Sequence, residues 1–343
     1  MTVEIGDIVG AAEFEDLRTK MVRILGTPTG TWTINSIGTT AGYNNNINAV
    51  SVFADELITA ADWNLLRQDI IRIYVHINGE EPSDGLAMPE LTADDLVTAE
   101  VYNTWESVQT INTNNRNTCH PTQKSLSNAS LGSIPTPWNG KQTHAFSMTW
   151  QDVNHKEGFF NAGGTLRFSA SANLPGGAGD KDNDWASIIA SIGTVEIKNL
   201  SVTSDGSAGI VKIPQTNGSG TTYAGWWYID ALPLNTPTAV YTINGGDVFG
   251  FPVYDENYYE ILVEKISDIQ YNFYVCFDDA DLGDGRPGVG NPRNPSGDGI
   301  GIDEDVLVEI NSNVFVETPS GDYVSLPVPT FAEVTPDNTL TLA

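Results

Sequence analysis

The chain has 343 residues and a formal net charge of −28, from 44 acidic and 16 basic side chains. Apolar residues make up 40% of it, which is enough for a sizeable core, while the negative charge argues against nucleic-acid binding and against docking on anionic membranes. Only 17% of the residues are charged, and abundant Thr, Asn, Ser and Gly favour strands and turns over long helices.

One helix-start pattern occurs three times near the beginning of the chain, at residues 7–14, 56–63 and 95–102. Each copy has an apolar residue, then Gly or Thr, then three residues and an aromatic side chain. In the middle copy Thr59 would be the N-cap of a helix, and Ile58 and Trp63 would form a hydrophobic staple, which fixes the angle at which a chain enters a helix. The other two copies repeat this arrangement. The copies are offset by 49 and 39 residues, too unequally for a regular solenoid. The pattern predicts three helices made from one reused docking element.

The apolar stripes of these helices predict their extent. The first closes at Gly26, the second ends at Asn78–Gly79, and the third is expected to dissolve at the asparagines from Asn112 onward. A short helix with one apolar stripe must bury it, and three of them cannot easily build an independent core. We therefore expect the helices to pack against one another or against a partner subunit. The predicted docking residues are Val9, Phe14, Leu17, Ile58, Trp63, Leu66, Val97, Tyr102 and Trp105.

Period-two patterns dominate the rest of the chain. Short strands are predicted at 31–34 and 49–52, before the second helix. A strand, glycine turn and strand are predicted over 159–170, and a short helix over 184–193. Further strands are predicted at 145–150, 194–197, 239–243, 258–263, 271–275 and 306–310. Many short strands separated by Gly and Asn turns are typical of an antiparallel sandwich or jelly roll.

The predicted fold class is α+β, with an N-terminal short-helix attachment region followed by an antiparallel β-sandwich or jelly-roll-like domain. Residues 1–118 would form the mainly helical attachment and oligomerisation region, and residues 119–139 a polar, turn-rich linker. Residues 140–326 would form the β-sandwich domain. Residues 327–343 would be a tail that is extended or pairs with a neighbouring subunit.

Motifs for enzymatic chemistry do not stand out. Walker A, HExxH and GxSxG patterns are absent from the sequence, and the GxGxxG match at 283–288 contains a proline where a helix should begin. The four histidines fit no metal-ligand spacing, and His76 lies late in the second predicted helix, where the helix dipole favours a cation. We therefore predict no catalytic residue, no enzyme activity and no cofactor.

Two acidic clusters leave calcium open as an alternative. Residues 180–184 have the DxDxD opening of a calcium loop but lack its Gly at position six and its Glu at position twelve. Residues 278–285 are equally acidic. Such loops either remain solvated or bind Ca²⁺, and a paired-carboxylate glycosidase is a third alternative. The candidate calcium ligands are Asp180, Asp182, Asp184, Asp279, Asp281 and Asp284.

Aromatic clusters in the second half can stack on sugar rings, or pack in a core or a subunit interface. The candidate glycan-binding or interface aromatics are Trp226, Trp227, Tyr228, Tyr258 and Tyr259.

Three stretches together resemble virion structural proteins of tailed phages, especially T4-like marine and cyanobacterial phages. They are the helix start at 58–67, the glycine-containing stretch 157–169 followed by Asp184–Trp185, and the acidic turn 302–306 that leads into a final strand pair. The resemblance implies a non-enzymatic tail, neck or fibre component that acts by assembly. The alternatives are a receptor- or glycan-binding module of the virion and a polysaccharide depolymerase.

The same resemblance implies location and partners. The expected partners are other virion proteins and further copies of the chain, as a trimer or hexamer, with a host surface glycan under the alternative function. Residues 1–4 begin acidic, and no apolar run approaches ~18 residues, so neither a secretory signal nor a membrane span is expected. We therefore expect synthesis in the host cytoplasm and assembly into the virion.

Overall fold

The computed structural model describes residues 4, 9–26, 42–53, 57–93, 95–176, 178, 180–199, 201–204, 215–216, 222–223, 225–244, 257–279, 306–322 and 324–334. At residues 180, 203–204, 215–216, 222–223, 227–228 and 244 it describes the backbone alone. The chain divides into two compact units. The helical unit comprises Met1–Leu126, Gln151–Gly164 and Glu317–Val328, and the sandwich unit comprises Ser127–Trp150, Thr165–Val316 and Pro329–Ala343.

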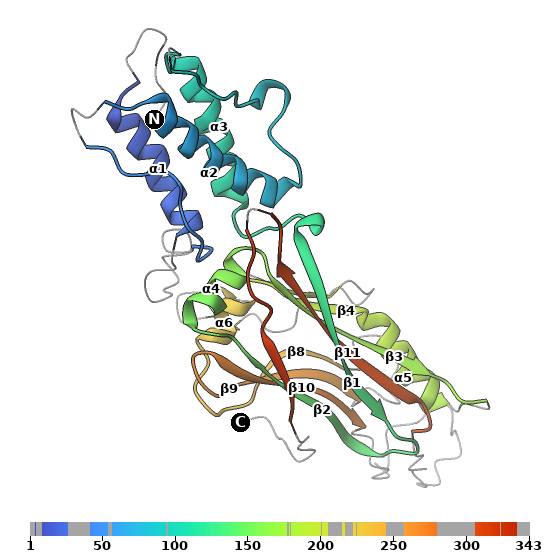
Figure 1. Ribbon diagram of the computed structural model, residues 1–343. Coiled ribbons are helices and arrows are strands. Elements are labelled where there is room, and N and C mark those ends of the chain that lie inside the picture. The colour runs from blue at the N-terminus through green and yellow to red at the C-terminus, as the bar shows by residue number, and fades with distance from the viewer. Residues whose placement is uncertain are drawn as a thin grey trace, which may run out of the picture. The chain divides into compact units, whose positions relative to one another are not determined.

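The fold class is α+β, as predicted: helices come first and two antiparallel sheets follow (Figure 1). The helical unit contains α1 (Ala11–Leu25), α2 (Ala60–Asn78) and α3 (Ala99–Asn115), which begin at the same end of the bundle (Figure 1). Two single 3₁₀ turns, Asp84–Leu86 and Pro121–Gln123, follow α2 and α3. Three parallel helices require long crossover connections, and the inserts between the copies of the helix-start pattern supply them.

The ends of these helices agree with the predictions in two cases and differ in one. Gly26 is the C-cap of α1, and Gly79 closes α2 in the left-handed conformation, with φ 82°. The third helix does not dissolve at its asparagines but continues to Asn115. Asn112 is buried, and its side-chain amide donates to the Ile70 carbonyl at 2.9 Å, so a tertiary contact with α2 outweighs the low helix propensity of asparagine.

The strand predicted at 49–52 is absent, and the one at 31–34 lies outside the described residues. The segment before α2 is instead held by a buried carboxylate. The amides of Asn48 and Ala49 both donate to Asp69 Oδ2 at 2.9 Å, so their backbone polar groups are satisfied without a strand partner.

The first half of the strand–turn–strand prediction over 159–170 is also wrong. Residues Val153–Asn161 form helix α4, capped by the Asp152 side chain, which accepts from the His155 amide at 2.7 Å. Gly158 allows α4 to approach the backbone of Tyr43, because a Cβ there would lie 2.8 Å from the Tyr43 carbonyl oxygen. The glycine turn and the following strand are present.

The sandwich unit is built on two five-stranded sheets, ordered β1-β11-β3-β4-β5 and β12-β2-β10-β9-β8. The strands of the first sheet are β1 (Lys124–Ile134), β3 (Thr165–Asn173), β4 (Thr194–Ile197), β5 (Val202–Ser204) and β11 (Glu309–Pro319). Those of the second are β2 (Gly140–Thr149), β8 (Thr238–Asn244), β9 (Tyr258–Lys265), β10 (Gln270–Asp279) and β12 (Thr330–Glu333). A separate pair is formed by β6 (Gln215–Thr216) and β7 (Thr222–Tyr223).

Aromatic side chains join the facing sheets. Phe146 on β2 and Phe273 on β10 stack at 5.1 Å between ring centroids, and Phe168 on β3 lies 6.0 and 5.7 Å from them. Two helices accompany the sheets, α5 (Asp180–Ile192), which matches the predicted short helix, and α6 (Trp226–Asp230). The core of this unit therefore forms through strand pairings between distant parts of the sequence.

The predicted linker and tail both contain strands. Residues 119–139 include the whole of β1, which pairs with β11, and its side chains alternate in exposure from Ser127 to Gly132, as successive side chains of a strand do. In the tail, β12 pairs antiparallel with β2 of the same chain, from Thr330 opposite Thr149 to Glu333 opposite Phe146. Residues 335–343 lie outside the described residues.

Candidate functional site

Two of the three copies of the helix-start pattern cap their helices with a threonine side chain. Thr59 accepts from the Asp62 amide at 3.4 Å, and the Asp62 carboxylate accepts from the Thr59 amide at 2.8 Å, which completes a capping box. In the first copy the Gly10 amide donates to Glu13 at 3.0 Å, although glycine offers no side-chain cap. In the third copy Thr98 accepts from the Val101 amide at 3.4 Å.

The aromatic residues of the first two copies meet each other and Trp105 of α3 inside the helical unit. Trp63 lies 5.0 Å from Phe14 and 5.6 Å from Trp105, measured between ring centroids, and both contacts are edge-on. Five predicted docking residues, Phe14, Leu17, Leu66, Tyr102 and Trp105, are completely buried there. Of the two predicted arrangements, the helices therefore adopt packing against one another. The helices build a core after all, because Trp63 of the second copy packs between Phe14 of the first copy and Trp105, which lies one turn after the third copy on α3.

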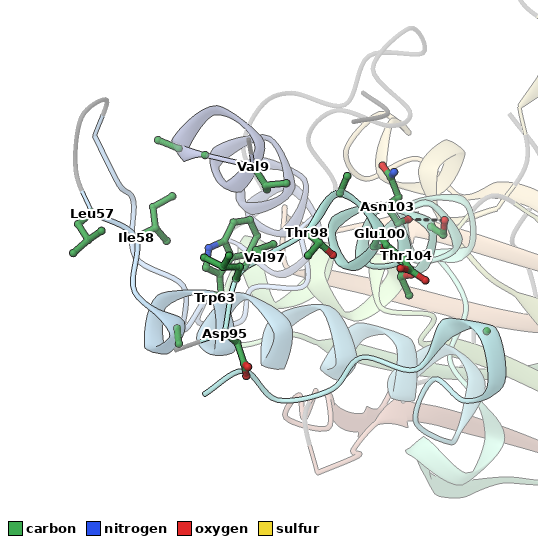
Figure 2. Close-up of a pocket in the computed structure, with 17 residues that line it drawn as sticks. Val9, Leu57, Ile58, Trp63, Asp95, Val97, Thr98, Glu100, Asn103 and Thr104 are labelled. Atoms are coloured by element: carbon green, nitrogen blue, oxygen red, sulfur yellow. Dashed lines mark hydrogen bonds between the residues drawn. The ribbon is translucent and has the colours of Figure 1, made fainter. Parts of the chain in front are cut away.

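The apolar residues that precede the three caps lie elsewhere. Val9, Ile58 and Val97 are half-buried and line one pocket, with a volume of about 1190 Å³, at the N-terminal end of the bundle. Figure 2 shows side chains of all three copies around it, with Trp63 at its base. The repeated element thus contributes one residue per copy to a common cavity. The pocket is lined by Val9, Gly10, Ala11, Leu57, Ile58, Ala60, Trp63, Gly85, Asp95, Leu96, Val97, Thr98, Ala99, Glu100, Asn103, Thr104 and Ser107.

Two leucines at the pocket were not among the predicted site residues. Leu57 is 84% exposed and Leu96 is 83% exposed, and each directly precedes the staple residue of its copy. Large apolar side chains at this exposure, gathered at one cavity, are typical of an interaction surface. The sequence contained the signal, because the position before the staple residue is apolar in every copy, including Ile8, which lies outside the described residues.

The loop before α3 is fastened to α2, which places the third copy beside the second. The Asn64 side chain donates to the Leu91 carbonyl at 2.8 Å and accepts from the Leu91 amide at 2.9 Å. Arg67 adds a hydrogen bond to the Met88 carbonyl. Two residues of α2 therefore hold the segment that leads to Leu96.

Polar side chains at the pocket are mostly engaged with their own backbone. Thr104 donates to the Glu100 carbonyl at 3.0 Å, and Ser107 donates to the Asn103 carbonyl at 2.8 Å. Hydrogen bonds from the Thr92 amide and hydroxyl lower the pKa of the Asp95 carboxyl group. The side chains of Val9, Leu57, Ile58, Leu96 and Val97 therefore give the pocket its apolar surface.

A cysteine and a histidine meet at the other end of the bundle. Cys119 Sγ lies 3.6 Å from His76 Nδ1, and His76 Nε2 donates to the Ala162 carbonyl at 2.8 Å. Burial lowers the pKa of His76 to about 4 and raises the pKa of the Cys119 thiol to about 12. The pair is therefore neutral, and this thiol is not an activated nucleophile. The predicted role of His76 as a cation at a helix end is wrong, because the ring is buried.

The described candidate calcium ligands of the two acidic clusters have other contacts. Asp182 accepts from the Leu307 and Val308 amides at 2.7 and 2.9 Å, and Asp279 forms a buried ion pair with Lys181 at 2.7 Å. Asp184 is half-buried on α5. The Asp180 side chain, Asp281 and Asp284 lie outside the described residues. Within the described ranges, no three Asp, Glu, His or Cys side chains gather as a metal site would require.

Two of the candidate glycan-binding aromatics belong to the core. Trp226 is 1% exposed and packs on Trp150 and Tyr271, at 5.1 and 4.7 Å between ring centroids. Tyr259 is equally buried, and Tyr258 is half-buried and donates to Asp278 at 2.6 Å. These contacts favour packing over sugar binding. The side chains of Trp227 and Tyr228 lie outside the described residues.

Comparison of the chain with protein-family models, curated proteins and solved structures gave no match. Among the described helices, none combines the length and apolar character that crossing a membrane requires.

Proposed function

We propose that this chain is a non-enzymatic structural component of a tailed-phage virion, in the tail, neck or fibres, and that it docks onto other virion proteins through the pocket at the N-terminal end of its helical bundle. The observation that carries the proposal is the convergence of three copies of one sequence pattern on a single apolar pocket. The resemblance of three stretches to phage virion proteins supplies the context. No cofactor is needed for this role.

The energetics of the pocket support docking. Burying one exposed leucine against a partner contributes roughly 1.5–3 kcal/mol, and Leu57 and Leu96 are both more than four-fifths exposed. Because the larger aromatics are already buried within the unit, the helices fold around a finished core and still present apolar surface. An assembly part needs this combination, since it must be stable before it meets its partner.

The proposal is tested by incorporation into particles. Virus that carries the paired substitution Leu57→Asp and Leu96→Asp should yield particles from which the chain is missing, because two carboxylates would have to be desolvated in the interface. The matched control is Leu174→Asp with Leu234→Asp, which changes two exposed leucines of the sandwich unit. The control should be incorporated like the unaltered chain, as measured by mass spectrometry of purified particles.

Circular dichroism of the purified variants checks that both pairs leave the fold intact. Full incorporation of the Leu57 and Leu96 variant would contradict the docking site. Absence of the unaltered chain from particles would contradict the virion role. Binding to a glycan array, or release of reducing ends from host polysaccharide, would favour the receptor-binding and depolymerase alternatives instead.

A further inference from the structure

The two sheets of the sandwich end in four edge strands, and three of these are protected against pairing with another chain. Within the described residues, β5 and β12 are only 3 and 4 residues long. β8 has an irregular register against β9 between Ala239 and Tyr241. Short strands and bulges are common ways in which proteins prevent association at sheet edges, because an exposed edge presents unpaired backbone donors and acceptors.

The fourth edge, β1, is not short, and its alternation of exposed and half-buried residues is interrupted near its end, at Gly132 (φ 109°) and Ser133. It is 11 residues long, and in the described part of the chain its one neighbour in the sheet is β11. From Ser125 to Ile134 it contains neither a charged residue nor a proline. Exposed and half-buried residues alternate from Ser127 to Gly132, and Leu126 is 60% exposed. A long, neutral row of backbone hydrogen-bonding groups therefore lies at this edge.

Charge indicates which partner this edge suits. With a net charge of −28, two copies of the chain repel each other over most of their surface. Antiparallel pairing across a two-fold axis also brings each strand opposite itself, so any charged residue near the axis would face a like charge. β1 places no like charges in contact at the axis, because its central residues, such as Asn128 and Ser130, are small and uncharged, so this edge is one where a second copy can approach in spite of the net charge.

We propose that β1 of one copy pairs antiparallel with β1 of a second copy, so that two five-stranded sheets join into one continuous sheet across a two-fold axis. The partner is a second copy of this chain, and the contact is made by main-chain hydrogen bonds. This interface uses none of the pocket residues at the ends of the helices. A self-pairing edge and a separate docking pocket would allow the chain to associate as a dimer and attach to a different protein.

Sedimentation velocity of the full chain over a series of concentrations tests this interface. The unaltered chain should sediment with twice the chain mass and dissociate on dilution. Asn128→Glu combined with Ser130→Glu should reduce the mass to that of one chain, because carboxylates would face each other across the axis. The matched control, Asn128→Thr combined with Ser130→Thr, keeps the edge neutral and should retain the dimer.

Hydrogen exchange supplies a readout that does not depend on variants. In the unaltered chain the amides of β1 should exchange more slowly at high than at low concentration, while those of β12 should not change. A chain that remains monomeric at every concentration would overturn the proposal. So would a folded Glu variant that keeps the dimer, or a dimer that is lost with Ala332→Glu on β12 and retained with the β1 substitutions.

Discussion

The helical unit and the sandwich unit build their aromatic cores by different routes. In the helical unit Phe14 and Trp63, whose rings meet, occupy equivalent positions of a repeated pattern, so the sequence marks both as members of one kind of site before their packing is known. In the sandwich unit Phe146 and Phe273 meet because β2 and β10 pair in one register, which places them directly opposite each other. Local repetition can therefore be read from one sequence, whereas strand register cannot.

The two units also treat buried ionisable groups differently. The sandwich unit encloses an ion pair, Lys181 with Asp279, whose side chains are 2% and 0% exposed. The helical unit encloses a histidine, His76, in its neutral form. Removing one charge of the Lys181–Asp279 pair should therefore lower the stability of the sandwich unit, whereas the stability of the helical unit should depend on pH through His76.

The largest expected effect comes from opening the helical core. Trp105→Ala removes a fully buried ring that packs on Trp63, and we expect it to lower the free energy of unfolding by roughly 3–5 kcal/mol. Hydrogen exchange should become faster in α1, α2 and α3. Unchanged exchange in these helices would show that their packing does not depend on the shared aromatic cluster.

A slightly smaller loss is expected in the sandwich unit. Lys181→Met leaves the Asp279 carboxylate buried without its ammonium partner, which should cost about 3 kcal/mol in urea unfolding. Adding Asp279→Leu should restore most of the stability, because an apolar pair can replace a buried ion pair. If the double variant is no more stable than the single one, the ion pair is not the source of the loss.

The pH dependence of the helical unit should follow His76. Burial lowers the pKa of His76 from 6.5 to about 4 in the folded chain. Between pH 6.5 and 4 the unfolded chain therefore binds a proton at this ring and the folded chain does not, which favours unfolding. The free energy of unfolding should be highest above pH 6.5 and should fall by up to about 3 kcal/mol as the pH is lowered toward 4. Urea unfolding as a function of pH measures the slope. His76→Gln should remove this part of it, and an identical profile would contradict the assignment.

The smallest expected effect concerns the caps. Thr59→Ala removes the side-chain acceptor at the start of α2 and should cost about 1 kcal/mol in thermal unfolding, whereas Thr59→Ser should preserve stability. Thr98→Ala should cost less, because α3 has a side-chain cap without the reciprocal carboxylate. Equal losses at the two positions would mean that the capping box adds nothing to α2.

The sequence was sufficient for the helix starts, because caps act over a few residues. α2 and α3 begin at Ala60 and Ala99, directly after the predicted caps. It was insufficient for α4, where the pattern suggested a strand. There the Asp152 cap and the close approach that Gly158 permits decide in favour of a helix.

For the candidate site, the sequence identified the apolar residues of the three copies but not the direction in which each would face. Phe14 and Tyr102 turned into the core, while Val9, Ile58 and Val97 came to line the pocket. The sequence of an apolar helix face is the same whether that face packs against the same chain or against another protein.

The sequence by itself determined the reuse of one capped helix start, the mixed α and β character, and the strongly acidic charge, since all three are properties of residue order and composition. Only the tertiary structure decided that the three starts lie at one end of a bundle, that the aromatic rings cover each other, and that a long strand with no charged residue after Lys124 lies at the edge of its sheet. These features depend on which distant segments meet, and that is settled by packing over the whole chain rather than by any local pattern.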